Sequence, residues 1–337
     1  MTSQDLVVNK VSDDEPQHNK RRKLHDHGGS GNRVSSPCVY DSIATTFEKI
    51  RSTSKRGEIQ CLTCELFKDI LSRGTPDDLI SALYMCMCKL SPDYEGTRLG
   101  IGESFVKDLL LVSYMNDSSN DYNVKMNMIA EMFKNLGDLG AVAQALHENK
   151  LNTVSFVDDT PSGGLMKISE VLEVFRLVAR TEGEGSAKRK REVLCDLLQR
   201  AKNGREVRYI VSSLLSSVRI GLAENTILAA LGQALHEYTN VPLDPSQCKK
   251  GKKTAKNAQK EAENIVREAY IRCPNIEVIV KTALQEGGVS ALLSNIEVCP
   301  GIPTAPMLAQ SSKGAEGILK KIGDRDFVCE YKYDGER

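Results

Sequence analysis

The residues best suited to chemistry in this 337-residue chain gather at its C-terminal end, where a lysine lies between two carboxylates. From residue 327 to residue 333 apolar and charged residues alternate, which predicts a β-strand because successive side chains on a strand point to opposite faces. Glu330, Lys332 and Asp334 would share the charged face. A deprotonated lysine amine is a good nucleophile, and Gly335 lets the backbone come close to a phosphate. A lysine between two carboxylates on one strand face therefore predicts a nucleotide pocket.

The spacing of these residues matches a known motif. Lys-x-Asp-Gly-x-Arg, the motif of nucleotidyltransferases, is complete at residues 332–337. Further matching segments are Leu-Gly-Asp-Leu-Gly at 136–140, Arg-Ile-Gly-Leu at 219–222, Pro-Gly-Ile-Pro at 300–303 and Pro-Met-Leu-Ala at 306–309. Over roughly residues 40–337 the sequence resembles the ATP-dependent DNA ligases of eukaryotes and archaea.

This resemblance implies an enzyme that uses ATP and Mg²⁺ and acts on nicked duplex DNA. Lys332 would attack the α-phosphate of ATP and carry AMP, which would pass to the 5′-phosphate at the nick before the 3′-hydroxyl displaces it. Glu330 would accept a hydrogen bond from the adenine amino group, and Arg337 would lie beside the ribose and phosphates. The role of Asp334 stays open.

The family's remaining nucleotidyltransferase motifs and its OB-fold domain follow this lysine, and the sequence ends at residue 337. We therefore expect the chain alone to be inactive in sealing and in self-adenylylation. A non-catalytic, truncated DNA-binding module is the alternative interpretation. Capping enzymes and RNA ligases share the lysine motif, but the long helical region before it argues against them. A helical protein-interaction scaffold would have no use for the motif.

Two glycine-containing segments are candidate contacts for DNA phosphates. Arg98, Gly100 and Gly102 align with Arg219, Gly221 and Ala223, 121 residues apart. Each segment would break a helix, so free backbone amides and a guanidinium would meet at one turn. An ordinary interhelical connection is the alternative. The repeat predicts two related halves of one helical domain.

A third candidate is the basic segment 181–191, where glycines end one helix and a second helix begins. Ser186 is a suitable N-cap, and Lys188 and Arg189 would occupy the first turn, where the helix dipole disfavours cations unless an anion binds. A solvated basic face is the alternative.

The rest of the chain predicts a mainly α fold. Apolar residues recur at helical spacing from about residue 40 to residue 295, interrupted by polar loops at 149–164 and 242–256. We expect a disordered tail at 1–37, a multi-helix DNA-binding domain with two pseudo-symmetric halves at 38–298, and the start of an α/β adenylation domain at 299–337. That start would hold a short helix at 315–322 and the strand at 327–333.

Composition sets further limits. Lys+Arg and Asp+Glu both total 45, so net charge identifies no partner. No signal peptide or membrane-length apolar run is present, and the ten cysteines form no disulfide framework. The basic run 20–23 is typical of a nuclear localisation signal, with a solvated charge run as the alternative. We expect a nuclear monomer with no bound structural metal. The tail has no Gln-and-aromatic sliding-clamp motif.

Overall fold

The computed structural model describes residues 37–115, 121–154, 165–216, 218–239, 252–304, 312 and 314–331. The predicted tail with its basic run lies outside these ranges except for residue 37, and so does most of the basic loop 242–256. The described helices are α1 (Tyr40–Arg51), α2 (Arg56–Arg73), α3 (Pro76–Met87), η1 (Asp93–Glu95), α4 (Glu103–Tyr114), α5 (Tyr122–Leu136), α6 (Leu139–Val154), α7 (Ile168–Arg180), α8 (Ser186–Arg200), α9 (Gly204–Leu214), α10 (Glu224–Thr239), α11 (Lys252–Arg272), α12 (Ile276–Gln285), η3 (Val289–Ala291), α13 (Leu292–Asn295) and α14 (Gly314–Ile322). The predicted mainly α fold is confirmed.

Polar residues before several helices fix where those helices begin. Thr75 and Asp78 form a reciprocal capping box at the start of α3, and Pro76 follows at the first helical position. Asn203 caps α9, and Asn275 caps α12 by accepting hydrogen bonds from two backbone amides. These caps stabilise helix starts without a ligand.

The helical domain has an internal pseudo-two-fold relation. The six helices α1 to α6 of the first half correspond in order to the six helices α7 to α12 of the second half, so that α1 is equivalent to α7 and α6 to α12. The packed pairs α1–α9, α2–α10 and α6–α9 then match α7–α3, α8–α4 and α12–α3. The pairs α1–α2, α4–α5 and α5–α6 match α7–α8, α10–α11 and α11–α12 in the same way. The prediction of two related halves is therefore supported by packing as well as by sequence.

The centre of this relation lies where α1 and α7 begin. Tyr40 N donates to the Met166 carbonyl at 2.8 Å, and Ile168 N donates to the Cys38 carbonyl at 3.0 Å. The two bonds exchange equivalent groups 128 residues apart, as a two-fold relation requires.

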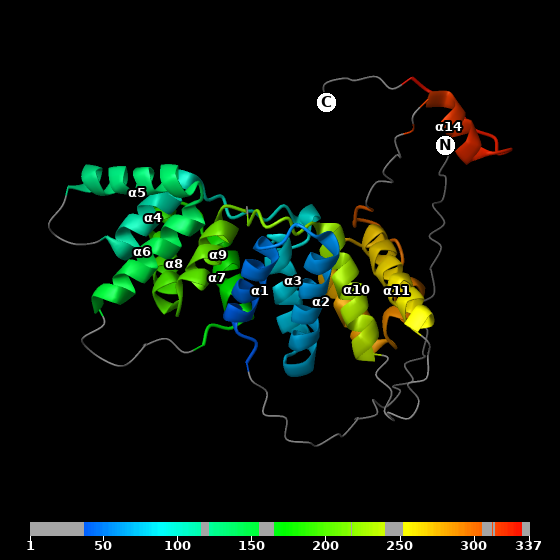
Figure 1. Ribbon diagram of the computed structural model, residues 1–337, viewed down its shortest axis with the longest axis horizontal. Helices are drawn as coiled ribbons and strands as arrows, with labels where there is room; N and C mark the ends of the chain where they lie inside the picture. The colour runs from blue at the N-terminus through cyan, green and yellow to red at the C-terminus, as the bar shows by residue number, and fades with distance from the viewer. Residues whose placement is uncertain are drawn as a thin grey trace, which may run out of the picture. The chain divides into compact units, whose positions relative to one another are not determined.

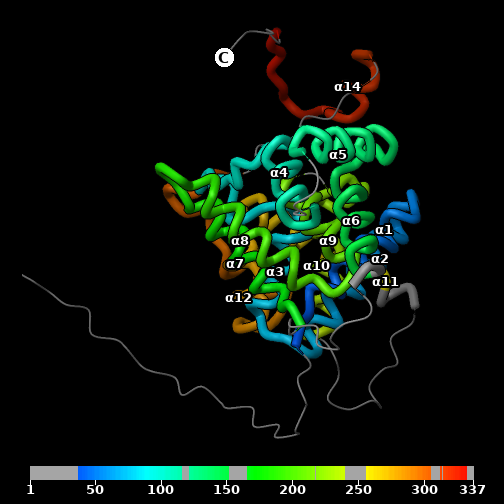
Figure 2. Tube along the Cα trace, turned by 90° about the vertical axis from the view of Figure 1, so that its left-hand side faces the viewer, coloured from blue at the N-terminus to red at the C-terminus, as the bar shows by residue number. Residues whose placement is uncertain are grey.

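The two halves exchange helices and do not face each other as separate bodies. α2 of the first half packs on α10 of the second, and α4 packs on α8 (Figure 1). α5 lies across the neighbouring ends of α4 and α6 in both views of the chain (Figure 2). Because each group of packed helices draws on both halves, neither half can bury its apolar faces alone.

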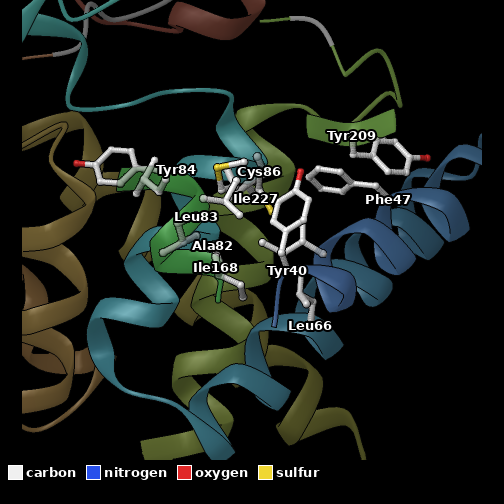
Figure 3. Packing of buried hydrophobic residues seen from close by; sticks show 14 of the residues in the cluster. Tyr40, Phe47, Leu66, Ala82, Leu83, Tyr84, Cys86, Ile168, Tyr209 and Ile227 are labelled. Atoms are coloured by element: carbon white, nitrogen blue, oxygen red, sulfur yellow. The ribbon is translucent and has the colours of Figure 1, made fainter. Parts of the chain in front are cut away.

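One buried cluster joins the halves. Figure 3 shows Tyr40, Ile168 and Ile227 meeting near the middle of the domain, from helices α1, α7 and α10. Phe47 and Tyr209 pack edge to face with ring centroids 5.3 Å apart, and the Tyr209 hydroxyl donates to Glu48 at 2.7 Å. Such aromatic pairs add about 1 kcal/mol beyond the area they bury. These contacts tie α1 of the first half to α9 of the second half.

The C-terminal segment agrees with the sequence in one respect and differs in another. The predicted short helix is α14. The predicted strand is wrong over its described part, since residues 327–331 are not assigned to any strand. A strand is stabilised by hydrogen bonds to a neighbouring strand, and no partner for this segment occurs among the described residues. Val328 and Tyr331 are accordingly 85% and 88% exposed.

Candidate nucleic-acid interface

The first turn, residues 98–102, leads into α4. Leu99 is buried and anchors the turn, whereas Arg98 and Gly100 are exposed. Gly100 has φ +63°, a left-handed conformation that glycine adopts without steric cost. Gly102 occupies the N-cap position and offers no side chain to the amides of the first helical turn. These amides are therefore available to an external acceptor such as a phosphate.

The second turn, residues 219–223, has the same construction before α10. Ile220 is buried in the place of Leu99, and Gly221 has φ +75° in the place of Gly100. Ala223 precedes the helix and carries no polar side chain to cap it. Arg219 is exposed and itself has φ +47°, which is costly for a residue with a Cβ. The two surface turns therefore share an exposed arginine, a buried apolar residue and a left-handed glycine, and they differ at the arginine, where only Arg219 has a positive φ.

The two turns lie next to each other on the surface. Gly102 of the first turn and Arg219 of the second line the same hollow of about 440 Å³, together with Arg51 and Arg208. The first turn also borders a second hollow of about 720 Å³, which reaches Ser216. The two turns are 121 residues apart in the chain. The hollows show that the first turn shares one stretch of surface with the second turn and with the residues just before it.

Arg51 and Arg208 were not among the residues that the sequence singled out. Arg51 ends α1, and its guanidinium lies 3.5 Å from Glu48. Arg208 is buried in α9 and pairs with Asp138 at 3.1 Å. Only the packing of α1 and α9 brings them near Arg219, so no local sequence pattern could have indicated them.

The basic segment before α8 is only partly as predicted. The prediction that Ser186 caps α8 is wrong, because Gly185 occupies the N-cap position with φ +70° and Ser186 is the first helical residue. The Arg189 guanidinium folds back and donates to the carbonyls of Glu182 and Glu184, both at 2.9 Å. Lys188 is exposed and its side chain makes no hydrogen bond or ion pair with any other described residue, so its ammonium is available to an anion.

The Leu-Gly-Asp-Leu-Gly segment at 136–140 is a helix connection. Gly137 ends α5 with φ +70°, and the Asp138 carboxylate accepts hydrogen bonds from the amides of Gly140 and Ala141. Leu139 is buried. A Cβ on Gly140 would collide with the Ser212 hydroxyl and lie 2.7 Å from the Arg208 carbonyl. These residues fix the close approach of α6 to α9 below the hollow.

Most of the residues predicted to take part in adenylation lie outside the described part of the chain. Lys332, Asp334 and Arg337 lie outside the described residues, and Glu330 is exposed. No group of three His, Cys, Asp or Glu side chains within the described ranges could hold a metal ion.

Four cysteines that are close in sequence lie in or directly after helices. Cys61, Cys64 and Cys86 lie in α2 and α3, Cys88 follows α3, and all four are free thiols. Burial raises the pKa of Cys64 to about 12, which disfavours the thiolate that binds zinc. Among the described helices, none is long and apolar enough to cross a membrane.

Comparison with protein families identifies the class to which this arrangement belongs. A model of the DNA ligase N terminus matches residues 39–232, which is more than half of the chain, and a model of the ATP-dependent DNA ligase domain matches residues 306–337. The chain belongs to the ATP-dependent DNA ligase family.

Individual relatives agree with this assignment. The chain is 33% identical to DNA ligase 1 of Schizosaccharomyces pombe over 305 residues, which cover 90% of this chain and 36% of the relative. It is 30% identical to DNA ligase 1 of Saccharomyces cerevisiae over 329 residues, 96% of this chain and 41% of the relative. With DNA ligase 2 of Thermofilum pendens it shares 31% identity over 310 residues, 88% of this chain and 44% of the relative. The chain thus spans less than half the length of each of these relatives.

Proposed function

We propose that residues 38–298 bind nicked duplex DNA through its phosphate backbone, as the DNA-holding part of an ATP-dependent DNA ligase. The observation that carries this proposal is the pair of equivalent turns, each with an exposed arginine before a helix whose preceding residue, Gly102 or Ala223, has no polar side chain. Phosphate contacts position a protein on DNA without reading sequence. This suits a ligase, because a nick can occur in any sequence.

Arg98, Gly100 and Gly102 of the first turn and Arg219 and Gly221 of the second are the proposed backbone contacts. The turns lie side by side, so they would meet phosphates that are neighbours across a groove or across the nick. Ser186 and Lys188 at the start of α8 add a third contact, in which the exposed Lys188 ammonium would bind the phosphate. Arg189 would shape this contact, because its guanidinium already binds two carbonyl groups of the preceding turn.

The chemical step rests on the sequence motif. Lys332 would accept AMP from ATP, with Glu330 and Arg337 as nucleotide contacts and Mg²⁺ as the metal cofactor. We propose a nuclear location and a monomeric state for the chain. A non-catalytic DNA-binding module would use the same turns, and the two proposals differ in whether Lys332 ever carries AMP in the working protein.

The third contact can be tested with two variants of α8. Lys188→Ala should weaken binding to nicked duplex about fivefold and reduce the slope of log affinity against log salt by about one, because one phosphate contact is lost. Arg200→Ala is the matched control, since it removes a cation from the opposite end of the same helix, where Arg200 pairs with Glu170 at 2.9 Å. Equal salt slopes for wild type and Lys188→Ala would remove Lys188 from the interface.

A further inference from the structure

A lysine before the first turn meets a carboxylate just after the second turn. Lys89 Nζ lies 2.8 Å from Glu224 Oε1 and 2.7 Å from Asp93 Oδ2. Glu224 is the first residue of α10, and Lys89 lies in the loop that leads to the first turn. Lys89 and Glu224 are 135 residues apart, so this contact joins the loop before the first turn to the helix that follows the second turn.

Tyr270 of α11 completes the cluster. Its hydroxyl donates to the same Glu224 oxygen at 2.6 Å and lies 3.4 Å from Lys89 Nζ. An ammonium has three donors, and Lys89 faces three acceptors: Asp93, Glu224 and Tyr270. The donors of Lys89 are thus occupied within the protein, unlike those of a lysine that awaits a phosphate.

The surroundings favour a charged lysine. Burial alone lowers the pKa of Lys89, but the hydrogen bonds to Asp93 and Glu224 outweigh it and hold the pKa above its ordinary value. Its side chain is only 21% exposed. Burial, together with the hydrogen bond to Glu224, raises the pKa of Tyr270, which stays a neutral donor.

The cluster occurs on one side of the pseudo-two-fold relation. The equivalent of Glu224 is Glu103, the first residue of α4. Glu103 is exposed and its side chain forms no hydrogen bond or ion pair in the described part of the chain. A glutamate at this helix start therefore does not require a lysine partner for folding, and the Lys89 contact needs another explanation.

We propose that Lys89 is a positioning residue: it holds the first and second turns at the mutual spacing that duplex DNA requires, and it does not itself touch a phosphate. This inference rests on the proposed DNA-binding function. The α10 start carries the second turn, so fixing Glu224 to the loop before the first turn restricts how far the two arginine-bearing turns can separate. A preorganised pair of turns binds without the cost of ordering them.

The test measures the affinity of the full 337-residue chain for a nicked duplex over a salt series. Lys89→Met should lower the affinity about tenfold at each salt concentration and leave the slope of log affinity against log salt unchanged. Lys89→Arg keeps the charge and should recover most of the loss. Lys281→Met is the control, because Lys281 forms only an exposed ion pair with Glu277 at 3.9 Å.

A double-mutant cycle links Lys89 to the second turn. Arg219→Ala should cost several-fold less affinity in the Lys89→Met background than in wild type, since the turn is already displaced. If Lys89→Met does not fold, as judged by circular dichroism, Tyr270→Phe removes one hydrogen bond to Glu224 and should lower the affinity about threefold.

Three results would overturn the proposal. A slope reduced by about one in Lys89→Met would make Lys89 a direct phosphate contact. Unchanged affinity with a lowered melting temperature would make its role structural only. Additive effects in the cycle would separate Lys89 from the second turn. If the wild-type chain binds no duplex, the proposed DNA-binding function is refuted. That outcome differs from the three results above, in which the wild-type chain binds DNA.

Discussion

Replacing both turn arginines should nearly abolish DNA binding while the protein stays folded. We expect Arg98→Ala/Arg219→Ala to lower the affinity for nicked duplex about 100-fold or more, because a hydrogen bond to a charged group contributes about 1.5–3 kcal/mol. The slope of log affinity against log salt should fall by about two, one for each phosphate contact. Both side chains are exposed, so the core is untouched. Fluorescence anisotropy with a labelled nicked duplex measures both quantities.

The control for this double variant removes the same charge elsewhere. Arg200→Ala/Arg205→Ala takes away two guanidinium groups that pair with Glu170 at 2.9 Å and Asp41 at 3.7 Å. Its salt slope should match that of wild type. If the control loses as much slope as the turn variant, binding depends on total charge, and the two turns have no special role.

The second large effect concerns stability. Gly140→Ala should destabilise the domain by about 3 kcal/mol, because the new methyl group would collide with Ser212 and the Arg208 carbonyl of α9 and force α6 and α9 apart. Helix propensity alone predicts the opposite sign, a gain of about 1 kcal/mol, since Gly140 lies inside α6. Urea unfolding followed by circular dichroism decides between them.

Gly57→Ala is the matched control for this substitution. Gly57 also lies within a helix, but a Cβ there would meet no atom within 4 Å. This variant should be neutral or more stable by about 0.5–1 kcal/mol. A stabilised Gly140→Ala protein would mean that α6 and α9 can separate freely, contrary to the packing described above.

The helices could be predicted from the sequence because the patterns that indicate them are local. The apolar spacing along α7, for example at Val171, Leu172 and Phe175, predicts a helix whose buried face is the one observed. The two turns could be predicted for the same reason, since Gly100 and Gly221 interrupt two such apolar patterns at equivalent positions. The similarity of the two segments also predicts the internal repeat.

Features that depend on contacts between residues far apart in the chain could not be predicted from the sequence. The exchange of helices between the halves depends on which apolar faces meet, and periodicity alone does not choose partners. Arg189 looked like a phosphate ligand, but Glu182 and Glu184 present carbonyls to it once Gly185 turns the chain. Lys89 carries no motif at all, and its partner Glu224 lies 135 residues away. The alternation at 327–331 predicted a strand, but alternation does not supply a pairing partner.

The most direct measurement is equilibrium binding of the 337-residue chain to a nicked duplex and to the same duplex without the nick, across a salt series. We predict affinity that falls steeply with salt and favours the nicked duplex, because the adjacent turns would contact phosphates on both sides of the break. A chain with a helical circular dichroism spectrum that binds neither duplex would contradict this assignment, and the helical domain would then have to be a protein-interaction scaffold.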